Sequence, residues 1–119
     1  MKVILDEGVP EPLARGFPGH EISTLRALGW KGIKNGKLLD LIEDSGFDAF
    51  LTNDKRMEAE QLLQLRPFAI LILSACNWPV IRPHLDKIVD AVDHARPGTV
   101  TKIDCGTFVP LRFRRPGKS

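Results

Sequence analysis

Three acidic side chains stand at the ends of two strand-like segments. Asp6 and Glu7 directly follow the apolar run Lys2–Leu5, and Asp54 comes shortly after the run Asp48–Thr52. In an open parallel sheet, binding sites form beyond the carboxyl ends of the strands. If the two strands are neighbours in such a sheet, the three carboxylates converge.

Converging carboxylates repel one another and lose hydration unless a positive charge compensates them. Oxygen ligands of this kind suit a hard divalent cation, Mg²⁺ or Mn²⁺. A second interpretation is structural: Asp6 caps the first helix or a turn, and Asp54 caps the third helix. Position along the chain does not decide between the two.

Five polar residues near the predicted strand ends or helix starts are candidates for substrate binding: Asn35, Asn53, Lys55, Ser74 and Asn77. Ser74 and Asn77 follow the fourth strand-like run and could line the same cleft as the acids. Lys55 could contact a phosphate, pair with its neighbour Asp54, or face solvent. The Asn35–Gly36 pair is typical of a turn, which we expect before the second helix.

The elements that must position these residues alternate along the chain. The five strand-like segments are Lys2–Leu5, Glu21–Leu25, Asp48–Thr52, Phe68–Leu73 and Thr99–Ile103. Helical patterns between them cover Glu11–Arg15, Lys37–Asp44, Met57–Leu65 and Val80–Ala95. Such alternation predicts an α/β fold. We expect a single three-layer domain, with a mainly parallel five-stranded sheet and helices on both faces.

The composition is that of one globular domain: 119 residues, of which 43% are hydrophobic and 27% charged. Cys76 and Cys105 form no CxxC motif and have no histidine cluster beside them, which favours reduced thiols over a zinc site. The sequence contains no apolar run typical of a signal peptide or a membrane span. We therefore expect a cytoplasmic protein without membrane contact.

Two features bear on nucleic-acid binding. The segment 109–119 contains four basic residues and no acid, so it could follow a phosphate backbone or form a flexible, solvated tail after a domain of residues 1–108. Trp30 and Trp78 are expected to pack in the core, although either could stack on a base if exposed.

Several short motifs resemble, in order and spacing, a family of small bacterial PIN-like proteins. The run Leu5–Pro10 is similar to the LDENLP start of that family. Further similar segments are Gly19–Glu21, Leu28–Gly32, Lys34–Gly36, Gly46–Asp48, Leu51–Lys55 and Leu73–Ala75. The resemblance covers roughly residues 1 to 104.

This resemblance implies a PIN-like fold and ribonuclease chemistry dependent on Mg²⁺ or Mn²⁺. By match, Asp6 and Asp54 are the principal metal ligands, and Glu7 is an auxiliary acid of the catalytic group. The implied partners are RNA, a small antitoxin protein of a toxin–antitoxin pair, and a second copy in a homodimer.

The sequence departs from the family at the start of the second helix. Many relatives have an acid at the place of Asn35 or Lys37, and neither residue is acidic here. Asp40, one turn later, could replace that acid if it pointed inward, but it could equally face solvent. Arg56 stands where relatives have a neutral or acidic residue. The alternative function is therefore a PIN-like module that binds RNA or protein with little catalysis.

A receiver-like phosphoacceptor domain is a third, less favoured interpretation. It would use Asp54 as phosphoacceptor, Ser74 after the fourth strand and Lys102 near the fifth. Against it, the first helix is short, Asp54 is not followed by a proline-containing loop, and Lys102 is not followed by proline.

Overall fold

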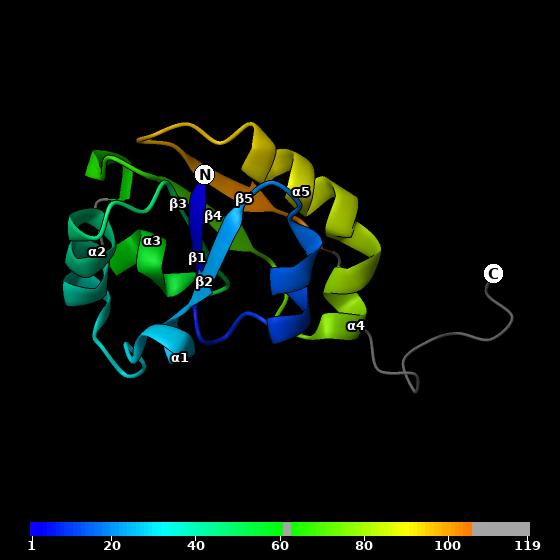
Figure 1. Cartoon of the computed structure of the whole chain (residues 1–119), viewed down its shortest axis with the longest axis horizontal. Helices are drawn as coiled ribbons and strands as arrows, with labels where there is room; N and C mark the ends of the chain where they lie inside the picture. Colours follow the sequence, from blue (N-terminus) through cyan, green and yellow to red (C-terminus); the bar gives the residue numbers. More distant parts are fainter. Residues whose placement is uncertain (61–62, 106–119) are drawn as a thin grey trace, which may run out of the picture.

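The computed structural model describes residues 1–60 and 63–105 (Figure 1). Its five strands form an all-parallel sheet in the spatial order β2-β1-β3-β4-β5. They are β1 (Lys2–Leu5), β2 (Glu21–Thr24), β3 (Ala49–Thr52), β4 (Ala69–Leu73) and β5 (Val100–Ile103). Each agrees with its predicted segment to within one residue at either end, so the predicted sheet is confirmed.

Helices cover both faces of this sheet, which confirms the three-layer α/β architecture (Figure 1). On one face lie α1 (Leu25–Leu28), α2 (Asn35–Asp44) and α3 (Arg56–Glu60). On the other lie the 3₁₀ helix η1 (Glu11–Gly16), α4 (Trp78–Ile81) and α5 (Leu85–Asp93). The turns η2 (Leu63–Leu65) and η3 (Arg82–His84) complete the described elements.

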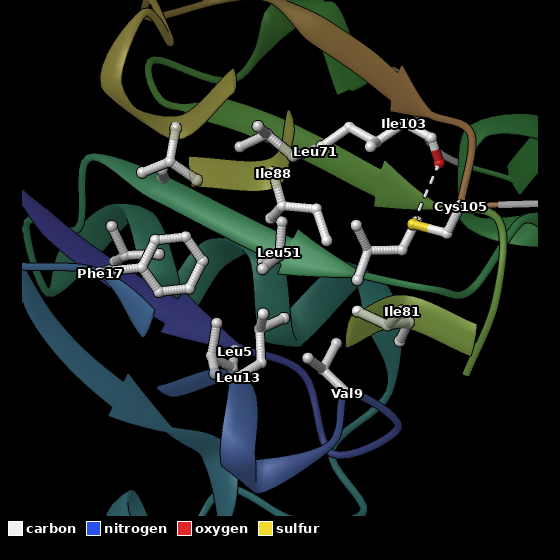
Figure 2. Close-up of a cluster of buried hydrophobic side chains, with 14 of the residues drawn as sticks. Leu5, Val9, Leu13, Phe17, Leu51, Leu71, Ile81, Ile88, Ile103 and Cys105 are labelled. Carbon is white, nitrogen blue, oxygen red and sulfur yellow. Dashed lines mark hydrogen bonds between the residues drawn. The ribbon is translucent and has the colours of Figure 1, made fainter. Parts of the chain in front are cut away.

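Two hydrophobic clusters hold the layers together, because successive strand residues point to opposite faces of the sheet. Ile4, Phe50 and Ile70 pack toward the α2 face, and Leu5 and Leu51 pack toward the α5 face. Figure 2 shows the second cluster, in which residues of the sheet meet side chains of η1, α4 and α5. β3 and β4 are buried along their whole length, as strands covered on both faces must be.

The long helix predicted over Val80–Ala95 is wrong in one respect. The segment is divided into α4, η3 and α5, with Pro83 in the middle of the 3₁₀ turn. Proline lacks the N–H that would continue the helical ladder, and its ring collides with the preceding turn. The helical spacing of the apolar residues therefore continues through a point at which the helix itself is interrupted.

The chain around α1 and α2 also differs from the prediction. The second strand ends at Thr24, whose hydroxyl accepts a hydrogen bond from the backbone N–H of Ala27 (3.1 Å) and so caps the unpredicted one-turn helix α1. Asn35 and Gly36 do not form a turn before α2. They are its first two residues, and Lys34 precedes the helix in an extended conformation.

Other expectations fall partly beyond the described chain. The predicted helix Met57–Leu65 is present as α3 and η2, with residues 61–62 outside the described residues. The predicted tail 109–119 and the domain end at residue 108 also lie outside them. Both cysteines are free thiols, as expected. None of the described helices is long and apolar enough to cross a membrane.

Candidate functional site

The topology brings the ends of β1 and β3 together. The chain turns from β1 to β2 on one side and continues with β3 on the other, so the winding direction reverses between β1 and β3. In sheets of this order, ligands bind at that reversal. Leu5 pairs with Leu51, and the backbone N–H of Asp6 donates to the Leu51 carbonyl (2.9 Å). The two acid-bearing loops therefore leave the sheet side by side.

Thr52 connects these two loops through its hydroxyl. Its side chain is fully buried, donates to Asp6 Oδ2 (2.6 Å) and accepts a hydrogen bond from the backbone N–H of Asp54 (3.1 Å). Sequence reasoning did not identify Thr52 as a site residue. The signal was present, because Thr52 is the polar residue that closes the otherwise apolar strand Ala49–Thr52.

Asp6 is the acid most affected by its surroundings. Burial raises the pKa of its carboxyl above the ordinary aspartate value, and the negative charges of Glu7 and Asp54 add to that rise. Hydrogen bonds from Thr52 and from the backbone N–H of Glu7 (2.8 Å to Oδ1) lower the pKa and offset part of it. The carboxylate form of Asp6 would therefore be stabilised by a nearby positive charge.

Asp54 combines the two roles considered from the sequence. Its Oδ1 accepts a hydrogen bond from the backbone N–H of Arg56 (3.0 Å), at the first residue of α3, as a capping side chain does. The Arg56 guanidinium lies 3.8 Å from the same oxygen and is largely exposed. At the same time Asp54 is close enough to raise the pKa of Asp6. The side chain of Asp54 therefore both caps α3 and lies near the carboxylate of Asp6.

Asn35 joins this group from the start of α2. Its Nδ2 donates to Asp54 Oδ2 (3.2 Å). Lys37, the other position considered for an acid from the resemblance to PIN-like proteins, is exposed. Asp40 does not replace the missing acid, because it faces solvent and pairs with Arg66 (2.6 Å). An amide thus stands where a third carboxylate could have been.

Asn53 has a structural contact that ties the two acid-bearing loops. Its Nδ2 donates to the Gly8 carbonyl (2.7 Å). A Cβ at Gly8 would lie 2.6 Å from Asn53 Oδ1, so the loops approach as closely as glycine permits. The amide group of Asn53 is therefore engaged in positioning the loops.

The ends of β4 and β5 form a separate polar region. Ser74 Oγ accepts a hydrogen bond from the backbone N–H of Cys105 (2.7 Å), and Lys102 Nζ pairs with Glu58 (2.7 Å). A small pocket of about 250 Å³ is lined by Lys55, Glu58, Ser74 and Lys102, and Asp6 is not part of its lining. The two side chains that a receiver would use beside Asp54 are thus bonded to other partners.

A larger cleft of about 620 Å³ opens beside Asp6 and Glu7. Its walls come from the loop after β1, from the region of α1, and from α4 with the loop that precedes it. Asn77 lines it, as expected, and so do the basic residues Arg26 and Lys31. Asp54 does not line this cleft.

Within residues 1–60 and 63–105, no three His, Cys, Asp or Glu side chains are grouped so that they could hold a metal ion. Asp6, Glu7 and Asp54 therefore do not form a complete cage of protein ligands. Mg²⁺ commonly binds through one or two carboxylates and completes its shell with water and substrate phosphates. The arrangement fits only a site of this open kind.

No family model matches the chain, and neither curated proteins nor solved structures give a significant match.

Proposed function

We propose that the protein is a metal-dependent ribonuclease of PIN-like type. Asp6 and Asp54 would bind one Mg²⁺ or Mn²⁺ ion, and Glu7 would act as an auxiliary acid. The observation that carries the proposal is the hydrogen-bonded group Asp6–Thr52–Asp54 at the reversal of the sheet, beside an open cleft.

The charge balance of Asp6 supports a cation at this place. Its pKa is raised by burial and by two neighbouring carboxylates, and a hard cation would relieve both effects. Each Asp6 oxygen accepts one hydrogen bond, from Thr52 or from the backbone N–H of Glu7. A carboxylate oxygen has about two acceptor positions, so each retains one for a metal.

When bound, such an ion would polarise the scissile phosphate and lower the pKa of a water molecule. The chain itself supplies the ligands, the hydroxyl of Thr52 that fixes the orientation of Asp6, and the Asn35 amide that fixes Asp54. With two carboxylates, the site depends on the RNA phosphate to complete the coordination, so metal and substrate should bind cooperatively.

The test is Mn²⁺ binding by calorimetry together with cleavage of single-stranded RNA. Asp54→Asn should abolish both, and so should Asp6→Asn. Asp40→Asn is the matched control, because Asp40 is an exposed acid that pairs with Arg66 away from the site. RNA cleavage that persists in EDTA, or that survives both site changes, would overturn the proposal.

The alternative is a PIN-like module that binds RNA or protein without turnover. Asp54 favours it, since the Arg56 guanidinium lies 3.8 Å from Oδ1 and already offsets part of the negative charge that a metal would need. RNA affinity that is unaffected by EDTA, without any cleavage in Mn²⁺, would establish this alternative. A toxin role with an antitoxin partner, and a homodimer, follow from the family resemblance alone and remain proposals.

A further inference from the structure

The cleft beside Asp6 combines three kinds of side chain. The residues that matter here are the acids Asp6 and Glu7, the cations Arg26 and Lys31, and the rings of Trp78 and Pro79. The volume of about 620 Å³ lies within the range of pockets that enclose a small organic group. A flat ring beside cations is the lining expected for a nucleotide, which has a π-face and an anionic phosphate.

The two tryptophans occupy different environments. Trp30 packs against the ring of Phe47 in an edge-to-face contact, with centroids 6.2 Å apart, on the α2 side of the sheet. Trp78 packs partly against the cluster on the α5 side, is only half-buried, and lines the cleft. Of the two, Trp78 is the one that lines the cleft.

The two cations of the cleft also differ. Arg26 is tied to Glu11 by an exposed ion pair (3.4 Å), so part of its charge is already balanced. Lys31 is exposed and forms no ion pair with any residue of the described chain. A phosphate that enters the cleft would therefore find its strongest uncompensated attraction at Lys31.

We propose that this cleft binds one unpaired nucleotide of single-stranded RNA, with its base stacked on Trp78 and a phosphate held by Lys31. The proposal rests on the ribonuclease function and adds the residues that select the strand. In a duplex the bases are stacked on one another and cannot present a face to a protein ring. Trp78 therefore makes the protein specific for single strands, with little preference for base identity.

Tryptophan fluorescence tests the stacking directly. Trp30→Phe leaves Trp78 as the sole tryptophan, and the probe is a short single-stranded oligodeoxyuridylate, added with and without Mg²⁺. We expect quenching of the Trp78 emission. The matched control is Trp78→Phe, in which Trp30 is the sole tryptophan and should show none. A lack of quenching in both buffers, or equal quenching by a duplex of the same length, would overturn the proposal.

Affinity measurements separate the two contacts. Trp78→Leu keeps an apolar side chain against the core but removes the aromatic face, so affinity for the single strand should fall about tenfold. Trp78→Phe should retain affinity within about threefold, since phenylalanine still stacks. Lys31→Ala should lower the slope of log affinity against log salt by about one, whereas Lys37→Ala, on an exposed part of α2, should not.

The outcomes distinguish this cleft from the nuclease function itself. If metal-dependent cleavage is unchanged in Trp78→Leu and no quenching is seen, the nuclease function stands and nucleotide binding in the cleft is wrong. If Trp78 is quenched in Trp30→Phe and affinity falls in Trp78→Leu, but no metal supports cleavage, the cleft binds a nucleotide and the nuclease function is wrong.

Discussion

The ends of β1 and β3 and the ends of β4 and β5 lie on the same edge of one sheet, yet their polar groups differ. At β4 and β5, Lys102 pairs with Glu58, and Ser74 accepts a hydrogen bond from the Cys105 backbone. At β1 and β3, Asp6 is partly buried with a raised pKa, among other carboxylates. Lys102 and Glu58 balance each other in the first region, whereas Asp6 in the second forms no ion pair within the described residues.

The difference shows where this fold has capacity for a ligand. A balanced pair gains little from a further ion, since each charge already has its partner and most of its water. A desolvated carboxylate beside two others gains from any cation that reaches it. The position of a polar residue at a strand end is therefore less informative than whether its charge is compensated.

The largest expected effect is on catalysis. Asp6→Asn and Asp54→Asn should each lower metal-dependent RNA cleavage by about 100-fold or more, because each removes a metal ligand. Lys102→Ala, the matched change in the balanced region, should leave cleavage within about twofold, since its exposed pair contributes little. A loss in Lys102→Ala as large as in the aspartate variants would show that the two regions act together.

The next largest effect is a gain in metal affinity. Asn35→Asp would place a third carboxylate against Asp54, in the position where the amide now donates. Affinity for Mn²⁺ should rise by about tenfold, because added ligand charge strengthens binding of a hard cation. Lys37→Asp, on the exposed side of α2, should change affinity much less. Calorimetry compares the two, and equal gains would mean that a general charge effect is responsible.

The third prediction concerns stability. Thr52→Val leaves the carboxylate of Asp6 without its donor and the Asp54 N–H without its acceptor, and should lower the free energy of unfolding by about 2–3 kcal/mol. Ser74→Ala removes one acceptor from a backbone N–H and should cost about 1 kcal/mol. Urea unfolding measures both. Equal losses of stability in the two variants would mean that the charge on Asp6 does not strengthen its hydrogen bond with Thr52.

The smallest effect is a pH dependence. The pKa of Asp6 is raised in the folded state, so the folded protein keeps this proton at pH values where the unfolded chain has lost it. Asp6 therefore stabilises the fold below the ordinary aspartate pKa and loses that contribution as pH rises through the folded-state value. The stability of Asp6→Asn relative to wild type should grow over that interval. A difference that is constant with pH would contradict the raised pKa.

Much of the fold was predictable because strand segments with apolar residues on both faces have few alternatives. β4 is buried along its length, and its apolar run in the sequence was correspondingly continuous. Short elements were harder: α1 has four residues, too few to show a helical period. The division at Pro83 was missed because the apolar spacing of Val80–Ala95 is compatible with one helix, while the backbone is not.

The candidate site was predictable in its acids and less so in their surroundings. Asp6 and Asp54 were identified because they follow strands, and strand order alone then determines whether they meet. Ser74, chosen by the same rule, lies in the other pocket, since it follows β4, which is separated from β1 by β3. Lys55 follows β3, the neighbour of β1, and yet it lines that pocket too. Arg26 and Lys31 were not identified, because nothing in their local sequence indicates that α1 borders the cleft.

The sequence by itself determined the alternation of strands and helices, the parallel sheet, and the acids at the ends of two strands. These depend on local periodicity and on residue type, which can be read along the chain. Only the tertiary structure decided that Thr52 bridges Asp6 and Asp54, that Asn35 occupies the place beside them, and that Asp40 faces away. Those relations join residues far apart in the chain, and they depend on packing distances of a few ångströms that local patterns do not contain.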